Sequence, residues 1–232
     1  MKSVSKLIAF AAFCAAFTVL LMAADPKPVN LGSAANFAVL GGTSVTCTNS
    51  SVTGDLGVAP GTSVTGFPPT STLCKHVGTI HAGDAVATRA HNDFVIAYDA
   101  LKAMPCAPAN HLTGQGLGGK TLAPGVYCFD TTAGLTGNLT LDGPSNGVWV
   151  FQIGTGLTTG IGSVVMTGGG QEGNVYWLVG TAATIGTGTA FQGNILAGTA
   201  ITFTGVGSRL VGRALAKAQV TMTGANIWLP IQ

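Results

Sequence analysis

The segment NILAGTAITFTG, residues 194–205, reads as two short β-strands joined by a corner of small residues. Successive side chains of a strand point to opposite faces. In the second strand, Ile201 and Phe203 therefore share one face, which is an ordinary core face. Ala200, Thr202 and Thr204 share the other face, which carries methyl groups and hydroxyls but no charge. An uncharged outward face of this kind is unusual, and the rest of the chain repeats it.

Four further segments show the same order of an apolar strand, a short corner and a second strand that begins with Thr or Ala. They are GVYCFDTTAGLTGNL (125–139), GVWVFQIGTGLTTGI (147–161), NVYWLVGTAATIG (174–186) and RALAKAQVTMTG (213–224). Third pieces such as GTAFQG and SRLVG lie between them. A period of about 20 residues with three short strands per repeat, and Gly at the corners, is typical of a β-solenoid of triangular section. A β-sandwich of short strands is the alternative fold.

The amino-terminal part predicts a first coil over residues 36–66, then a helix over about 82–104, then the remaining coils over about 121–229. The helix is indicated by apolar residues at three- and four-residue spacing, which form one face of an amphipathic helix. These residues are Val86, Ala90, Phe94, Ala97 and Leu101. A helix of about 22 residues is roughly 33 Å long, and six coils at about 4.8 Å each are roughly 29 Å tall. We therefore expect the helix to lie along one solenoid face and to connect the first coil to the far end of the stack.

The first 24 residues form a separate segment. Two lysines, Lys2 and Lys6, precede an apolar run over residues 7–22, and two alanines follow it. This order is that of a secretory signal peptide over residues 1–24. Residues 25–232 are then predicted to be a single domain that is secreted and extracellular. A membrane anchor is the alternative, but the run is short for one.

Charge is scarce: only 8% of the 232 residues are Asp, Glu, Lys or Arg, against about 25% in ordinary globular domains. Cleavage of the signal peptide removes two of the ten basic residues and none of the eight acidic ones, which leaves a formal net charge of zero. This argues against nucleic acid or an anionic membrane as partner, because both require clustered Lys and Arg. Arg209, Arg213 and Lys217 form one small cluster, which we expect at a solvated corner with Asp55 as a candidate partner.

Four cysteines remain after the signal peptide, namely Cys47, Cys74, Cys106 and Cys128. An even number in an exported protein indicates two disulfides, whose connectivity the spacing leaves open. A zinc site is the alternative, although the chain contains no C-x-x-C pair. We expect neither a metal nor a cofactor.

A set of long motifs runs along residues 30–229. It comprises NLGSAANFAVLGGTSVT, VTGDLGVAPGTSVTGFPP, HAGDAVATRAHNDF, LGGKTLAPGVYCF, VWVFQIG, GNVYWLVGTAATIGTGTAFQGNILAGTAITF and GRALAKAQVTM. Together these motifs resemble the secreted microbial ice-binding (antifreeze) proteins of the discontinuous β-solenoid type. The resemblance implies a mostly-β fold, a right-handed solenoid of triangular cross-section with one long helix along one face and the first coil packed beside the last. It also implies a Cys106–Cys128 disulfide, which leaves Cys47 and Cys74 as the second pair.

In this family the ice-binding surface is a flat solenoid face built from T-A/G-x-T-like steps or related small polar residues. The resemblance assigns that role to five tetrads here, in each of which the third residue is predicted to point inward. The predicted ice-binding residues are Thr43, Ser44, Thr46, Thr155, Gly156, Thr158, Thr181, Ala182, Thr184, Thr199, Ala200, Thr202, Gln219 and Thr221. The segment TTAGLT (131–136) fits with an extra residue, which leaves the contribution of its coil open.

Two other functions are compatible with a solenoid. A polysaccharide-acting enzyme needs paired carboxylates, or a carboxylate and a base, in one cleft. The acids of the predicted coils are scattered singly, at Asp55, Asp130, Asp142 and Glu172, so we expect no enzyme. An extracellular adhesin or matrix protein would use the solenoid as a spacer. The favoured function is ice binding by a monomer whose partner is the ice crystal surface, with thermal hysteresis and inhibition of ice recrystallisation.

Overall fold

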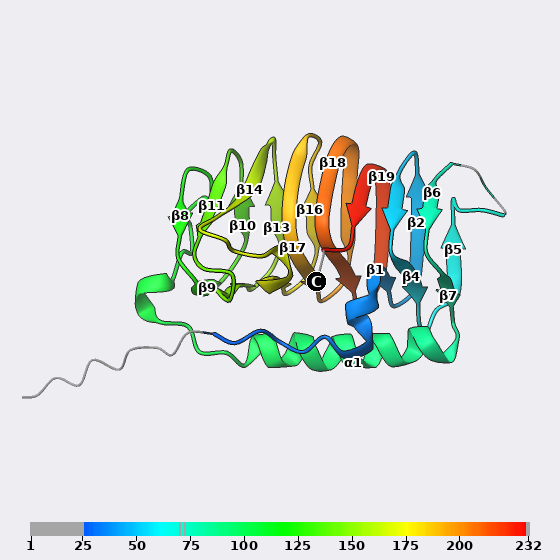
Figure 1. Cartoon of the computed structure of the whole chain (residues 1–232), viewed down its shortest axis with the longest axis horizontal. Coiled ribbons are helices and arrows are strands. Elements are labelled where there is room, and N and C mark those ends of the chain that lie inside the picture. Colours follow the sequence, from blue (N-terminus) through cyan, green and yellow to red (C-terminus); the bar gives the residue numbers. More distant parts are fainter. Residues whose placement is uncertain (1–25, 70, 72, 231–232) are drawn as a thin grey trace, which may run out of the picture.

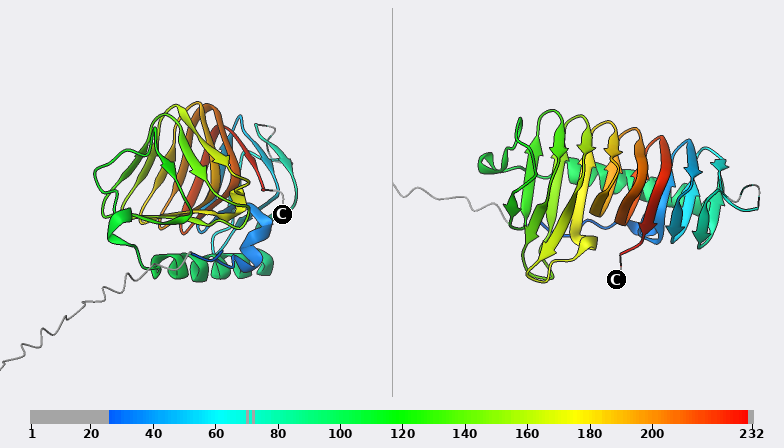
Figure 2. Two further views of the ribbon diagram at one scale, coloured as in Figure 1. Left: turned by 60° about the vertical axis from the view of Figure 1, so that its left-hand side comes forward. Right: turned by 90° about the horizontal axis from the view of Figure 1, so that it is seen from above.

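Parallel pairing joins all the strands of the structure, a computed structural model that describes residues 26–69, 71 and 73–230. The strands form three faces of a β-solenoid of triangular section, and one α-helix lies along its side (Figure 1 and Figure 2). The predicted signal peptide lies outside the described residues. Among the helices that the structure describes, none has the length and apolar character needed to cross a membrane.

The helix-covered face packs against the α-helix. Its eight strands or strand segments, in stacking order, are β9 (Gly125–Phe129), β12 (Trp149–Ile153), β15 (Val175–Val179), the last part of β17 (Thr189–Ala197), the last part of β18 (Ile201–Ala216), β1 (Phe37–Gly41), β4 (Asp55–Val58) and β7 (Ile80–Ala82). From β9 to β4 most residues of these strands are buried, which explains their mostly apolar sequences, whereas the end strand β7 is half-buried to exposed.

The other two faces have no helix over them. We call one the threonine face; its strands are β10 (Ala133–Leu135), β13 (Leu157–Thr159), β16 (Ala183–Ile185), the first part of β18, the first part of β19 (Gln219–Trp228), β2 (Ser44–Thr48) and β5 (Ser63–Thr65). The third face contains β8 (Thr121–Leu122), β11 (Leu139–Asp142), β14 (Gly162–Thr167), the first part of β17, the middle of β18, the last part of β19, β3 (Ser51–Thr53) and β6 (Lys75–Val77).

The stacking order departs from the chain order at one point. The last coil does not end the solenoid, because β19 pairs with β2 and β18 pairs with β1. The amino-terminal strands therefore extend the stack beyond the carboxy-terminal ones, as the resemblance implies (Figure 1). The prediction of one coil over residues 36–66 is wrong in extent: β1 to β3 make one turn, and β4 to β6 make a second before β7.

Helix α1 (Ala85–Lys102) returns the chain from β7 to the opposite end of the stack (Figure 1). It begins where the Asp84 side chain accepts a hydrogen bond from the Ala87 N–H at 2.8 Å, an N-cap that also lowers the pKa of Asp84. Its 18 residues are about 27 Å long. Two short 3-10 helices flank this region, η1 (Gly32–Asn36) and η2 (Pro108–Asn110), and a third, η3 (Glu172–Asn174), precedes β15.

The buried stripe of α1 differs from the prediction at its first position. It consists of Ala87, Ala90, Phe94, Ala97, Tyr98 and Leu101. Val86 is 49% exposed, so its assignment to the apolar face is wrong. Two four-residue steps lead from Val86 to Phe94 and rotate around the helix by more than two full turns, so Val86 lies off the buried face. From Ala87 onward, steps of three and four residues alternate, and this spacing keeps the apolar side chains on that face.

Inside the solenoid, aromatic side chains stack from one coil to the next. The ring centroids are 5.6 Å apart for Tyr127 and Phe151, 3.9 Å for Phe151 and Trp177, and 4.7 Å for Trp177 and Phe191. These residues occupy β9, β12, β15 and β17 and are all buried. Tyr127, Phe151 and Trp177 are register partners in three successive coils, so their stacking joins these coils, and Phe191 packs against Trp177 from the third face.

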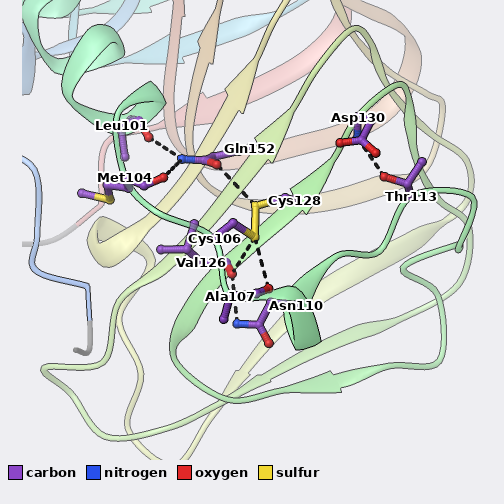
Figure 3. Close-up of a disulfide and its surroundings, with 10 residues drawn as sticks. All are labelled: Leu101, Met104, Cys106, Ala107, Asn110, Thr113, Val126, Cys128, Asp130 and Gln152. Carbon is purple, nitrogen blue, oxygen red and sulfur yellow. Dashed lines mark hydrogen bonds between the residues drawn. A yellow bond between two sulfur atoms is a disulfide. The ribbon is translucent and has the colours of Figure 1, made fainter. Parts of the chain in front are cut away.

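Both predicted disulfides are confirmed. Cys47 pairs with Cys74 and Cys106 with Cys128, with Cα atoms 6.2 and 6.3 Å apart. Figure 3 shows the second bridge beside the carboxyl end of α1. There the Gln152 amide donates to the backbone carbonyls of Leu101 and Met104 at 2.7 and 2.8 Å. This bridge and these bonds tie the exit of the helix to β9 and β12.

The basic cluster predicted at a solvated corner is wrong for Arg213. Its side chain is 3% exposed, and it donates from Nε to the Ala35 carbonyl and from Nη1 to Asn194 Oδ1, both at 2.8 Å. Asp55 instead accepts from the Thr79 N–H at 2.8 Å. Arg213 thus joins β18 and β17 to η1, because its long side chain reaches acceptors that are remote in the sequence.

Candidate functional site

A ladder of threonines crosses the threonine face. Its members, in stacking order, are Thr158, Thr184, Thr202, Thr221, Thr46 and Thr65. Each is the direct register partner of the next, so the ladder passes from β19 to β2 without a shift. Thr158, Thr46 and Thr65 are exposed and the other three are half-buried. At the β10 end, Gly134 takes the position of a threonine.

A second column of small or neutral side chains lies two residues before the ladder. Its members are Gly156, Ala182, Ala200, Gln219, Ser44 and Ser63, and Thr132 continues it on the coil of β10. The residues between the two columns point inward: Val45, Leu157, Ala183, Ile201 and Val220 are at most 1% exposed. The predicted alternation of each tetrad is therefore confirmed.

The first residues of the tetrads also align, at the corner before the face. Each N–H bonds to the carbonyl of the coil before it: Thr155 to Thr131, Thr181 to Thr155, Thr199 to Thr181, Ala218 to Thr199 and Thr43 to Ala218, at 2.7–3.0 Å. The structure thus brings all fourteen residues of the predicted site into three neighbouring columns. Ala218 is the one member of this corner column that is not a threonine.

The threonine face is uncharged and regular. Its strand residues include no Asp, Glu, Lys or Arg. Neighbouring strands of a sheet are about 4.8 Å apart, and outward residues along one strand about 6.6–6.8 Å apart. Lys217 lies at the adjoining corner, but its Nζ is 3.9 Å from the centroid of the Tyr98 ring and 3.9 Å from Asp99 Oδ1, so it points toward α1. The face offers methyl groups and hydroxyls in a two-dimensional grid.

The family model described as ice-binding-like matches residues 39–228 of the chain. The chain belongs to the ice-binding-like family. A protein of Nostoc sp. (strain HG1) named an ice-binding protein is 50% identical over 196 residues, which cover 83% of this chain and 71% of that protein.

Solved structures of ice-binding proteins have the same fold. The crystal structure of an ice-binding protein from an Antarctic biological consortium has a TM-score of 0.84 and 40% identity, and the match covers 91% of this chain and 95% of that one. The ice-binding protein of the Antarctic ascomycete Antarctomyces psychrotrophicus has a TM-score of 0.82 and 34% identity, covering 89% and 100%. The predicted family and the predicted solenoid with one helix are confirmed. The relatives are named for ice binding and not for a reaction.

In this member of the family, two residues of the grid were missing from the sequence prediction. Ser63 and Thr65 on β5 pair with Ser44 and Thr46 on β2. The prediction missed them because it assigned residues 36–66 to one coil, whereas β2 and β5 belong to two successive coils. The sequence does indicate a second coil here, because the pentapeptide GTSVT occurs at both 42–46 and 61–65.

The structure also shows how the coil of β10 fits the tetrad pattern. The tetrad in register with residues 155–158 is Thr131-Thr132-Ala133-Gly134, without an extra residue. The apparent insertion came from aligning Leu135 and Thr136 with the end of the tetrad. This coil therefore reaches the face with two exposed threonines, Thr131 and Thr132, and lacks the ladder threonine.

A cavity of about 410 Å³ lies near the carboxyl end of α1, lined in part by Lys102, His111, Asp130 and the Cys106–Cys128 bridge. Ligand atoms of Cys106, His111 and Cys128 lie within 4.8 Å of one another. Because both cysteines are oxidised, they supply no thiolate to a metal. Asp142 accepts a hydrogen bond from Thr167 at 2.8 Å on the third face, and Asp55 is bonded to Thr79. These acids have local structural partners.

Proposed function

We propose that this protein binds ice through the threonine face. The observation that carries the proposal is the ladder of six register-matched threonines, from Thr158 to Thr65, on a face without charge. Ice presents water molecules at fixed repeats, and a β-solenoid presents side chains at repeats of about 4.8 and 6.6–6.8 Å. A ladder without a register shift keeps both repeats along the whole face.

Threonine suits such a surface for two reasons. Its β-branched side chain has few χ1 rotamers, so little conformational entropy is lost when water around it becomes ordered. Its hydroxyl can join a water network, while its methyl group favours ordered water at an apolar surface. A charged side chain would bind water strongly in its own geometry. The uncharged strands of the threonine face therefore match the proposed ligand.

The third face is the competing flat surface, and its composition argues against it. Exposed charged residues lie on it, including Lys75, Arg209 and Asp142, and Trp228 is 37% exposed. These side chains differ in length and charge from one strand to the next. Such a surface does not offer one repeated hydration pattern. The proposal therefore assigns ice to the threonine face alone.

Adsorption to ice would stop crystal growth between bound molecules, which produces thermal hysteresis and inhibits recrystallisation. The naming of relatives and structural neighbours as ice-binding proteins supports this assignment. The order of features in residues 1–24 supports secretion into the extracellular space. We propose a monomer that acts as a binding protein and not as an enzyme, with the ice crystal as its partner.

The test is Thr202→Tyr, at the middle of the ladder, compared with Thr53→Tyr on β3 of the third face. Both are strand threonines, and substitutions at such outward positions cost under about 0.5 kcal/mol. Thr202→Tyr should lose most of its freezing-point depression in nanolitre osmometry, because one protruding ring holds neighbouring coils off the ice. Thr53→Tyr should keep it. Full activity in a folded Thr202→Tyr variant would refute the assignment, and loss in Thr53→Tyr alone would move the site to the third face.

A further inference from the structure

Three neighbouring strands continue past the end of the tetrad toward the third face. β13, β16 and β5 end at Thr159, Ile185 and Thr65. The strands β18, β19 and β2 run on, and their parallel register extends through Thr204, Thr223 and Thr48. These three strands are adjacent and lie between β16 and β5, where the last coil of the chain meets the first.

The added residues point outward. The residues before them point into the core: Phe203 and Met222 have no exposed surface, and Cys47 is 1% exposed. Thr204 and Thr223 are exposed and Thr48 is half-buried. They continue the alternation that places Thr202, Thr221 and Thr46 on the surface.

The coils of β13, β16 and β5 do not supply this column. The corresponding residues next to β13 and β16 are Gly160 and Gly186, and a Cβ at Gly186 would lie 2.3 Å from the Thr159 carbonyl oxygen. Next to β5 the position is Phe67, which is buried. The three extra threonines that are adjacent to one another therefore lie on β18, β19 and β2. Thr136, exposed after β10, has the same register position but is separated from Thr204 by Gly160 and Gly186.

We infer that Thr204, Thr223 and Thr48 form a further column of the ice-binding surface, centred on β18, β19 and β2. This inference rests on the proposed function. This part of the face is then a grid with three outward residues on each of three neighbouring coils: Ala200, Thr202 and Thr204; Gln219, Thr221 and Thr223; Ser44, Thr46 and Thr48.

The surroundings of Thr204 hold this column in place and set its limit. Its hydroxyl donates to the Ile185 carbonyl at 3.4 Å, and the Thr187 hydroxyl donates to the Thr204 carbonyl at 3.1 Å. Beyond Thr204 the register with β19 shifts before Ser208, and Val206 at that corner is 80% exposed. The regular grid therefore ends at this column, and its hydroxyls and methyl groups are the last that can match a flat lattice.

The experiment compares Thr223→Tyr with Thr202→Tyr and Thr53→Tyr, each checked for folding by its Tm and measured for freezing-point depression. The inference predicts that Thr223→Tyr and Thr202→Tyr both lose most activity and that Thr53→Tyr keeps it. If Thr202→Tyr loses activity and Thr223→Tyr keeps it, the further column is excluded and the proposed function stands. If all three keep full activity, the proposed function fails and the inference fails with it.

A milder variant covers the case in which Thr223→Tyr does not fold. Thr204→Ser with Thr223→Ser removes two methyl groups and adds no bulk. With an unchanged Tm, it should show a reduced freezing-point depression, whereas Thr53→Ser should match the parent. An unchanged freezing-point depression in the double serine variant would overturn the inference.

Discussion

Thr221 on β19 and Thr46 on β2 are direct register partners, although one belongs to the last coil of the chain and the other to the first. The threonine face is thus assembled from two parts of the chain that are far apart in sequence. Backbone bonds across this junction, such as Thr43 N–H to the Ala218 carbonyl at 2.9 Å, keep its repeat equal to that within each part. A function that needs one continuous grid depends on this pairing as much as on the threonines.

The Cys47–Cys74 disulfide stabilises the amino-terminal end of that grid. Replacing both cysteines with Ala should lower the free energy of unfolding by about 2–4 kcal/mol, because the bridge restricts the unfolded chain. Freezing-point depression near 0 °C should persist, since strand register is held by backbone bonds. Denaturant unfolding with and without the bridge measures the loss. An unchanged free energy of unfolding would show that the bridge is not a stability element.

The local pattern of each coil was predictable from sequence, and its long-range surroundings were not. Alternation within residues such as Ala200, Ile201 and Thr202 fixes which side chains face out, because strand geometry leaves no choice. The burial of Arg213 was not predictable, since its acceptors at Ala35 and Asn194 come close only in the folded chain.

The extent of the site was also underestimated for a physical reason. A tetrad predicts two outward residues, but strand length decides whether a third follows. Gly186 ends the flat part after β16, whereas β18 continues through Thr204. That difference depends on how corners pack against neighbouring coils, which a single repeat does not encode.

Ice activity should not require metal ions and should respond only weakly to salt. The strand residues of the threonine face carry no charge for ions to screen, and the oxidised Cys106 and Cys128 provide no thiolate ligands. Freezing-point depression should be equal before and after dialysis against EDTA, once corrected for the buffer alone. Loss with EDTA and recovery with calcium would contradict this expectation.

His91 should make stability fall in mildly acidic solution. Its Nε2 is buried and lacks a hydrogen-bond partner among the residues the structure describes. Burial, and then the nearby charge of Lys217, lower the pKa of this imidazole from its ordinary value. The folded protein thus resists protonation that the unfolded chain accepts near pH 6.5. Stability should be constant above that pH and decrease as pH falls from there toward the lower folded pKa.

The measurement is the free energy of unfolding at several pH values between 7.5 and 5 for the parent and for His91→Gln. The groups around His91 include Phe94, whose ring centroid is 5.6 Å away, and Lys217. The variant should show a flatter pH dependence in this range, because Asp84 and Asp93, with pKa values lowered mainly by backbone hydrogen bonds, act only at lower pH. Equal slopes would exclude His91 as the source.

Gln219 is the one long side chain in the second column, whose neighbours are Ala200 on β18 and Ser44 on β2. It is exposed, and ordering its rotamers against ice would cost up to about 2 kcal/mol. Ala218 beside it interrupts the corner column of threonines between Thr199 and Thr43. The double change Ala218→Thr, Gln219→Ala gives this coil the chemistry of residues 199–202. It should increase freezing-point depression without changing Tm, whereas Gln171→Ala, at an exposed loop position, should leave both unchanged. A decrease in the double variant would mean that the Gln219 amide itself takes part in ordering water on the face.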